Sequence, residues 1–164
     1  MNIVITGASR GIGKAVAVRF AMEGHSVIVC SREEHKLNEL RAQFPSVITF
    51  VCDMSKKEEV LRFGDFVLQT FDKIDVLVNN AGVFLHGKII EEEDNILEQT
   101  LNTNLFSAYY LTKKLTPRLI DQKNGYIINM CSVASIMAYG NGGSYSISKF
   151  ALLGFSKSLR EELK

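Results

Sequence analysis

Short apolar runs alternate with longer stretches of helical periodicity along the chain. The apolar runs are nearly continuous, as expected for strands covered on both faces, and they lie at Asn2 to Thr6, Ser26 to Cys30, Val47 to Cys52, Ile74 to Asn79 and Tyr126 to Cys131. Apolar residues recur with helical spacing at about Gly11 to Glu23, Glu33 to Phe44, Lys56 to Phe71, Asn95 to Ile120 and Tyr145 to Glu162. Such alternation is typical of parallel βαβ units with right-handed crossovers. We therefore predict a doubly wound α/β fold, with five parallel strands in the order 3-2-1-4-5 and helices on both faces.

Three local signals indicate how the predicted helices begin and end. Ser55 followed by Glu58 matches a capping box, in which each side chain bonds the backbone amide of the other, at the start of the third helix. Pro117 lacks a backbone N–H, so we expect it to kink or end the fourth helix near its last turn. The acidic run Glu91 to Asp94 suits a solvated helix start, where carboxylates are favoured, and we assign it no chemistry.

Length and charge restrict the class of protein. A chain of 164 residues can bury a core but is short for two domains, so we expect residues 1–164 to form a single domain. Its 19 Lys and Arg against 18 Asp and Glu give no bulk charge that favours nucleic acid or an anionic membrane. The apolar start at Met1 lacks signal-peptide features, and no apolar stretch reaches the length of a membrane span. The expected location is therefore cytoplasmic.

The cysteines indicate a reduced protein. Cys30, Cys52 and Cys131 are odd in number, widely spaced and placed in apolar, strand-like segments. Such cysteines are usually thiols packed in the core, not disulfides or the ligands of a metal cluster. We expect all three to be core thiols, and we predict no metal site.

A glycine-rich turn joins the first strand to the first helix. It reads Thr6-Gly7-Ala8-Ser9-Arg10-Gly11-Ile12-Gly13-Lys14. Amides at a helix N-terminus carry partial positive charge, and glycines let a diphosphate approach them closely, so the turn is a candidate anion cradle. The alternative is a tight turn that needs glycine only for its dihedral angles. The candidate contacts are Gly7, Ser9, Arg10, Gly11, Ile12 and Gly13.

The glycine spacing excludes two common phosphate-binding turns. Ala8 stands where the phosphate loop of nucleoside triphosphatases needs its first glycine, and Ala15 stands where a hydroxyl would hold magnesium. The glycines run G-x-x-x-G-x-G, which differs from the G-x-G-x-x-G turn of many dinucleotide-binding proteins.

The end of the second strand indicates which dinucleotide binds. In such folds this position meets the adenosine ribose, where a carboxylate binds the 2′-hydroxyl of NAD and repels a 2′-phosphate. Here the strand ends in Ser31 and Arg32, and Arg10 can approach the same place from the glycine turn. This charge favours NADP over NAD. The alternative is that Arg32 is an exposed helix-start residue balanced by Glu33 and Glu34, which can also accept ribose hydroxyls.

Tyr145 and Lys149 form a candidate acid–base pair. They are four residues apart at the start of the last predicted helix, which places them on one helix face. A free tyrosine has a pKa of about 10, and a nearby ammonium group favours the phenolate, which suits proton transfer near neutral pH. By itself such a pair is weak evidence, because it occurs commonly by chance and usually reflects surface packing.

Taken in order, these motifs resemble the short-chain dehydrogenases/reductases, a family of oxidoreductases with a Rossmann fold. The resemblance rests on the glycine turn, on Tyr145 and Lys149, and on Ser132, which ends the fifth strand thirteen residues before Tyr145. It implies hydride transfer between NADP(H) and a small carbonyl or alcohol substrate, with Tyr145 as general acid or base. It further implies that Ser132 hydrogen-bonds the carbonyl oxygen and that Lys149 holds the nicotinamide ribose.

The resemblance also implies further contacts. Asp53, with Met54 beside it, resembles the aspartate that contacts the adenine, although Asp53 alone could cap the following helix. Asn80-Ala81-Gly82 resembles the family's turn beside the cofactor. Both follow predicted strands, whose carboxyl ends face the ligand crevice in open α/β sheets. Asn104 resembles the asparagine that bends its helix and holds a water linked to the catalytic lysine; the alternative is a polar residue facing solvent.

The sequence departs from the family pattern at its end. It stops at Lys164, at the end of the catalytic helix, before the family's further strands and the lid over its substrate pocket. The fifth strand would then be an exposed apolar sheet edge that invites pairing with another chain. We expect a longer protein, a partner that completes the sheet, or a poor catalyst, and we favour the first.

Other functions stay open at this point. A dinucleotide-binding module without turnover, acting through a partner, is compatible with the missing lid. A sugar-nucleotide epimerase is disfavoured, because such enzymes generally carry a G-x-x-G-x-x-G turn. The predicted pocket wall, Val83 to Lys88 and Val133 to Gly143, does not specify a substrate. The resemblance implies a homo-oligomer through the last two helices, with these candidate contacts: Tyr109, Tyr110, Phe150 and Phe155.

Overall fold

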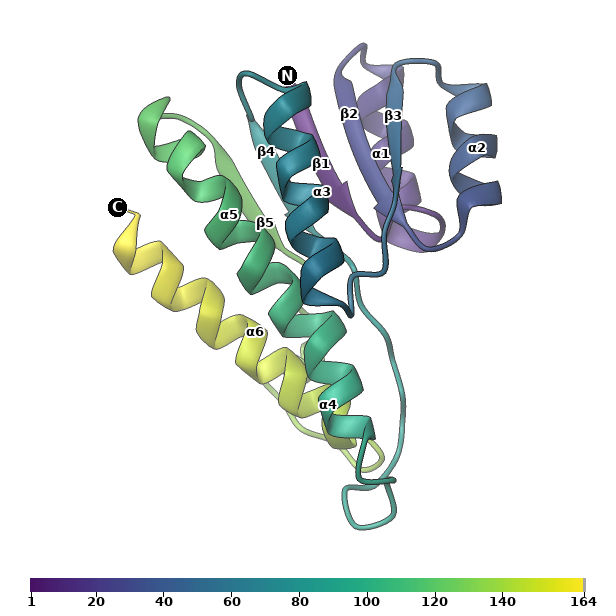
Figure 1. The fold of residues 1–164 in the computed structure, drawn as a ribbon. Helices are drawn as coiled ribbons and strands as arrows, with labels where there is room; N and C mark the ends of the chain where they lie inside the picture. The colour runs from purple at the N-terminus through teal and green to yellow at the C-terminus, as the bar shows by residue number, and fades with distance from the viewer. Residues whose placement is uncertain (164) are drawn as a thin grey trace.

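The computed structural model describes residues 1–163 and contains one parallel sheet (Figure 1). Its strands are β1 (Asn2–Thr6), β2 (Ser26–Ser31), β3 (Val47–Val51), β4 (Val76–Asn79) and β5 (Tyr126–Asn129). They lie in the order β3-β2-β1-β4-β5, and each neighbouring pair is parallel. The predicted fold class and strand order are confirmed.

Helices cover both faces of this sheet (Figure 1). They are α1 (Gly11–Met22), α2 (Glu34–Gln43), α3 (Lys57–Thr70), α4 (Ile96–Leu101), α5 (Ser107–Asp121) and α6 (Gly143–Glu162). A π-helical turn, η1 (Asn102–Phe106), joins α4 to α5, and a short 3-10 helix, η2 (Val133–Ser135), follows β5. One face packs against α1 and α2 and the other against α3 and α5, while α6 lies beside α5 at the β5 edge.

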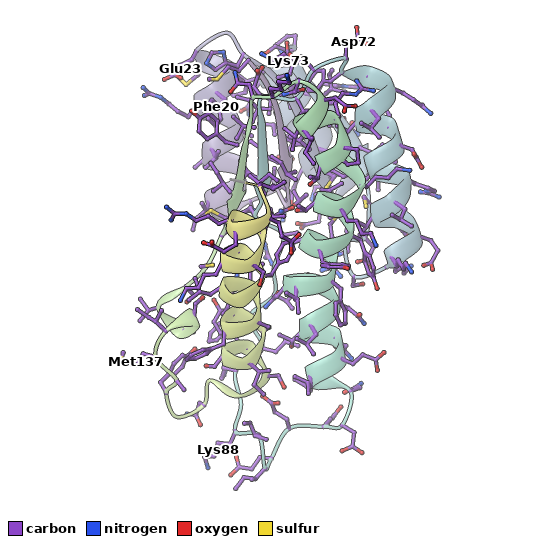
Figure 2. All side chains as sticks on the ribbon, turned by 90° about the vertical axis from the view of Figure 1, so that its left-hand side faces the viewer. Phe20, Glu23, Asp72, Lys73, Lys88 and Met137 are labelled. Carbon is purple, nitrogen blue, oxygen red and sulfur yellow. The ribbon has the colours of Figure 1, made fainter. Side chains whose placement is uncertain are left out.

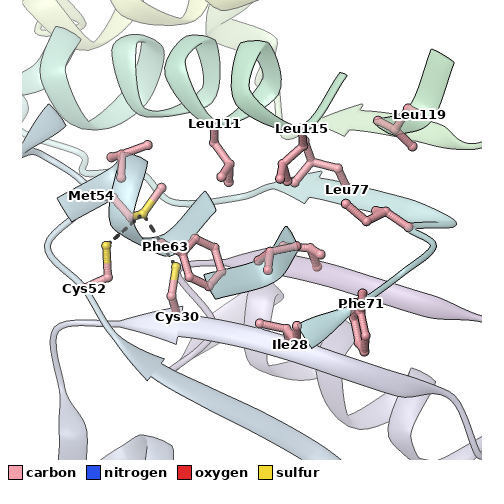
Figure 3. Close-up of a cluster of buried hydrophobic side chains, with 14 residues drawn as sticks. Ile28, Cys30, Cys52, Met54, Phe63, Phe71, Leu77, Leu111, Leu115 and Leu119 are labelled. Carbon is pink, nitrogen blue, oxygen red and sulfur yellow. Dashed lines mark hydrogen bonds between the residues drawn. The ribbon is translucent and has the colours of Figure 1, made fainter. Parts of the chain in front are cut away.

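The core between the sheet and the α3–α5 layer is built around Phe63 (Figure 3). This side chain is fully buried, and its ring lies 5.5 Å from that of Phe50. Cys30 and Cys52 are also buried there, with their sulfur atoms 3.6 and 3.5 Å from the sulfur of Met54. Burial and the neighbouring Cys52 raise the pKa of the Cys30 thiol well above its usual value. Both cysteines are therefore free thiols packed in the core, as predicted.

The third cysteine corrects the prediction. Cys131 is exposed, because β5 ends at Asn129 and the chain then leaves the sheet. Among the described residues β5 pairs only with β4, so its other edge stays open, as predicted. Tyr126 is 67% exposed and Ile128 44% exposed along this edge strand. A cleft of about 790 Å³ lies beside it, between α5, β5 and α6, and is remote from the glycine turn.

Buried polar side chains tie β5 into the sheet. Asn129 lies opposite Asn79 in the parallel register of β4 and β5. The Asn79 Nδ2 donates to Asn129 Oδ1 at 2.8 Å and to Thr112 Oγ1 at 2.9 Å. The Asn129 Nδ2 in turn donates to Ser156 Oγ at 2.8 Å. These bonds join two strands to α5 and α6.

One of the predicted helix signals is wrong. Ser55 does not cap α3: its Oγ donates to Asp53 Oδ1 at 2.8 Å, and Glu59, not Glu58, accepts from the Asp53 amide at 2.7 Å. Pro117 lies in the last turn of α5, which ends at Asp121, and the predicted kink there stays a prediction. A proline removes only one backbone hydrogen bond, which the surrounding packing tolerates near a helix end. The predicted helix is interrupted at η1.

Candidate active site

The candidate site lies at the carboxyl end of the sheet, where two long loops project beyond the strands (Figure 1). One loop joins β4 to α4, and the other joins β5 to α6. Figure 2 places Lys88 of the first loop and Met137 of the second at this end of the molecule, and Phe20, Glu23, Asp72 and Lys73 at the opposite end. The backbone amide of Gly87 donates to Asn141 O at 3.0 Å and joins the two loops.

The glycine turn is locked to the segment after β4. Asn80 Nδ2 donates to Thr6 O at 2.9 Å and to Gly7 O at 3.0 Å, while Thr6 Oγ1 accepts from the amides of Asn80 and Ala81. Gly7 has φ +67°, and a Cβ there would lie 2.7 Å from the Cα of Ala81. Both the positive φ and the close approach require glycine at this position.

The open side of the turn faces a cleft of about 290 Å³. Gly11 has φ +57°, and a Cβ there would meet no heavy atom within 4 Å, so its amide side is accessible to a ligand. Twelve predicted cofactor contacts line the cleft: Gly7, Ser9, Arg10, Gly11, Ile12, Ser31, Arg32, Asp53, Met54, Asn80, Ala81 and Gly82. Gly13 does not, because it packs against Asn80 and Gly7. These residues fit a dinucleotide diphosphate beside α1.

Four further residues line the cleft: Glu33, Cys52, Val83 and Thr103. Glu33 follows Arg32 and is the alternative ribose ligand that the sequence offers. Val83 belongs to the predicted wall of the substrate pocket. Thr103 carries no sequence signal, because it reaches the cleft only through the π-helical turn in the middle of a predicted helix. No sequence signal places Cys52 at the cleft, and its position there follows only from the fold.

Charges of both signs meet at the ribose end of this cleft. Arg10 and Arg32 are exposed at its rim. Glu33 lies between them and accepts from Ser9 Oγ at 2.8 Å and from Lys36 Nζ. The hydrogen bond from Lys36, followed by that from Ser9, lowers the pKa of Glu33. The carboxylate is therefore ionised and already engaged by two donors.

Asp53 faces the same cleft and does not cap α3. Partial burial works against its ionisation, but hydrogen bonds from the amide and hydroxyl of Ser55, with the charge of Arg32, lower its pKa below the ordinary value. Its carboxylate is thus an acceptor held in place at the end of β3.

Lys149 and Tyr145 start α6 beside the end of β5. Lys149 Nζ donates to Met130 O at 2.7 Å and lies 5.8 Å from the centroid of the Tyr145 ring. Burial lowers the pKa of Lys149, opposed by the nearby Cys131. The Tyr145 ring stacks edge-on against Phe84, with centroids 4.6 Å apart. The structure therefore brings the predicted pair together beside the two loops that follow β4 and β5.

Ser132 starts η2, which packs against α6. Its Oγ accepts from the Ala134 amide at 3.1 Å, and its own amide donates to Ser135 Oγ at 3.1 Å. Across residues 1–163, no hydrogen bond joins Ser132 directly to Tyr145. Because Ser132 Oγ acts as an acceptor here, its proton is available for an oxygen atom of a ligand.

Asn104 is buried, so the solvent-facing alternative does not hold. Its Oδ1 accepts from the Val83 amide at 2.7 Å, and its Nδ2 donates to Val83 O at 3.0 Å and to Ser148 Oγ at 2.9 Å. Ser148 Oγ donates onward to Tyr145 O at 2.7 Å. Asn104 thus links the loop after β4 to the backbone of Tyr145.

Replacing Asn104 with alanine is expected to lower the free energy of unfolding by about 1–3 kcal/mol, because the partly buried amide and carbonyl of Val83 lose their partners. Urea denaturation followed by circular dichroism measures the loss. Asn102→Ala, in the same π-helical turn but at a partly exposed position, is the control and should change stability by less than about 0.5 kcal/mol. Equal losses in both variants would show that the Asn104 bonds contribute nothing specific.

The candidate oligomer contacts fall into two groups. Tyr109 and Phe150 are 41% and 43% exposed, whereas Tyr110 packs against the core. Tyr109 also contacts the ring of Phe155 at 5.8 Å. The homo-oligomer stays a prediction.

Comparison with known proteins shows the family of this chain. The family described as short chain dehydrogenase matches residues 1–164. The chain belongs to the short-chain dehydrogenase family. The chain is 41% identical over 158 residues to dehydrogenase/reductase SDR family member 6 of Rattus norvegicus, covering 96% of the chain and 62% of the relative. It is 33% identical over 166 residues to 3-oxoacyl-(acyl-carrier-protein) reductase FabG of Thermotoga maritima, covering 98% of the chain and 67% of that relative.

The fold of the chain is similar to that in a crystal structure of a metagenomic short-chain oxidoreductase in complex with NADP. The TM-score is 0.93 at 33% identity, covering 99% of this chain and 76% of that one. The chain spans less than two thirds of the length of the rat relative. Among residues 1–163, none of the helices combines the length and the apolar character that crossing a bilayer needs.

Proposed function

We propose that this protein is an NADP(H)-dependent oxidoreductase that interconverts a carbonyl and an alcohol, with Tyr145 as the general acid or base. The observation that carries the proposal is the placement of Lys149, buried at the end of β5 with its ammonium group 5.8 Å from the Tyr145 ring. The start of α6, which carries the pair, lies at the same end of the sheet as the turn between β1 and α1 (Figure 1). A cation beside the phenol can stabilise the phenolate that forms when Tyr145 gives up its proton to a substrate.

In the proposed reaction, each residue of the site has a distinct role. A bound reduced nicotinamide supplies a hydride, which forms the new C–H bond at the carbonyl carbon. Tyr145 donates its proton to the developing alkoxide oxygen, and Ser132 donates a hydrogen bond to the same oxygen. Lys149 stabilises the resulting phenolate until a solvent proton restores it. In the opposite direction Tyr145 accepts the proton of the alcohol.

A panel of carbonyl compounds tests the proposal. Ketones, acyl-thioester ketones, pterins and sugars are each incubated with NADPH, and cofactor oxidation is followed by its absorbance. Reduction of at least one class, lost in Tyr145→Phe, supports the proposal. Cofactor binding without turnover of any class would favour a dinucleotide-binding module that acts through a partner.

The preference for NADP rests on Arg10 and Arg32 at the rim of the cleft. Arg32→Asp is expected to weaken NADPH binding about 10- to 100-fold, because a charge-assisted hydrogen bond to the 2′-phosphate is replaced by repulsion. NADH affinity should change by less than about threefold, and both dissociation constants can be measured by fluorescence titration. Arg41→Asp, exposed on α2, is the matched control. Equal weakening of both cofactors would contradict the assignment, and Glu33 would then be the better ribose contact.

A further inference from the structure

The start of α6 is capped by a residue from a distant loop. Its N-cap residue is Gly142, which has no side chain to pair with the free amides of the first helical turn. Glu92, in the loop between β4 and α4, supplies this partner. The Ser144 amide donates to Glu92 Oε1 at 3.0 Å and to Oε2 at 3.3 Å, and the Ser144 hydroxyl donates to Oε2 as well. A carboxylate in this place also complements the positive end of the helix dipole.

The surrounding backbone is shaped to admit this carboxylate. Gly143 has φ +35°, and a Cβ there would collide with Glu92 Oε1 and lie 2.6 Å from Gly87 O. A Cβ at Gly87 would lie 3.1 Å from Glu92 Cγ. The backbone bond from Gly87 to Asn141 closes the two loops around the same side chain. Glycines therefore stand at the two positions where a side chain would displace Glu92.

We propose that Glu92 is a positioning residue for Tyr145; this inference rests on the function proposed above. Ser144 directly precedes Tyr145, so the carboxylate fixes the backbone on one side of the tyrosine. On the other side, Ser148 Oγ donates to the Tyr145 carbonyl and is itself held by Asn104. Phe84, from the same loop as Glu92, packs on the Tyr145 ring. The loop after β4 thus holds both the backbone and the ring of Tyr145.

The geometry has a kinetic consequence. A proton-transferring group must stay within hydrogen-bond reach of the reacting oxygen, and a displacement of about 1 Å costs up to 100-fold in rate. Glu92 does not line the cleft beside the glycine turn, where we propose that the dinucleotide binds. Loss of Glu92 should therefore lower kcat and leave the dissociation constant of NADPH unchanged.

Three variants of the full chain test the proposal. Glu92→Ala removes both acceptors; Glu92→Gln keeps an acceptor oxygen and a polar partner for the Ser144 hydroxyl; Glu93→Ala, exposed in the same acidic run, is the control. For Glu92→Ala we expect Ser144 amide exchange to rise at least about 10-fold, loss of the Tyr145–Phe84 ring contact in nuclear Overhauser spectra, and a kcat about 10- to 100-fold lower. Glu92→Gln should retain most of the rate, and Glu93→Ala should match the parent chain.

The outcomes separate this inference from the proposed function. Unchanged Ser144 exchange and an intact Tyr145–Phe84 contact in Glu92→Ala overturn the positioning role, whether or not the protein turns over a carbonyl. An unchanged kcat in Glu92→Ala, with Tyr145→Phe inactive, also overturns it and leaves the proposed function standing. A fall in kcat of equal size in Glu92→Gln and Glu92→Ala points to the charge of Glu92 alone and contradicts positioning. If Glu92→Ala does not fold, Glu92→Asp, which is too short to span the same contacts, replaces it.

Discussion

Tyr145→Phe should lower kcat for carbonyl reduction about 10²- to 10⁴-fold, the range that positioned proton transfer contributes. The substitution removes only the hydroxyl, so the ring contact with Phe84 and the start of α6 are retained. Tyr145 is not among the residues that line the cofactor cleft, so NADPH should bind within about twofold of its parent affinity. Steady-state kinetics with the best substrate of the panel, together with a fluorescence titration, measure both effects.

The control for this variant is Tyr126→Phe. Tyr126 begins β5, outside both segments of the predicted pocket wall, and is 67% exposed, so losing its hydroxyl should leave kcat unchanged. A Tyr145→Phe protein that reduces a carbonyl at the parent rate would remove the basis of the proposed mechanism.

Phe63→Ala is expected to lower the free energy of unfolding by about 3–5 kcal/mol, because it opens a cavity in a fully buried site. Phe63 is 0% exposed and lies in the core shared by α3, α5 and the sheet (Figure 3). Urea denaturation measures the loss. Phe66→Ala is the matched control one turn further along α3: its ring also contacts Phe50, at 4.9 Å, but it is only partly buried. A loss in Phe66→Ala as large as in Phe63→Ala would contradict this picture of the core.

The sheet and the lining of the cleft beside the glycine turn could be predicted from the sequence because both depend on local signals. Nearly continuous apolar runs mark strands that are covered on both faces, and these runs matched the five strands to within two residues at each end. Gly7 and Gly11 adopt positive φ at positions where the spacing of the turn required glycine. The lining of the cleft followed, since the ends of parallel strands meet at one edge of a sheet.

Other features depend on contacts between distant segments and could not be predicted. The acidic run was read as solvated, yet Glu92 turns inward because Ser144, which lies 52 residues later, supplies its donors. Cys131 was placed in a strand by its apolar neighbours, but the hydrogen-bonded ladder ends at Asn129. Asn104 lies in a π-helical turn that no local pattern indicates, where bonds to Val83 and Ser148 offset the irregular backbone.

The amide pair Asn79–Asn129 has a consequence for Ser132. Side chains alternate along a strand, so sliding β5 by one residue would bring Ile128 or Met130 opposite Asn79 and turn the second amide away from Ser156. The same slip would carry Ser132 about 3.3 Å along the strand direction, which exceeds the tolerance of a hydrogen bond to a reacting oxygen. The pairing of Asn79 with Asn129 therefore determines where the chain places the hydroxyl of Ser132.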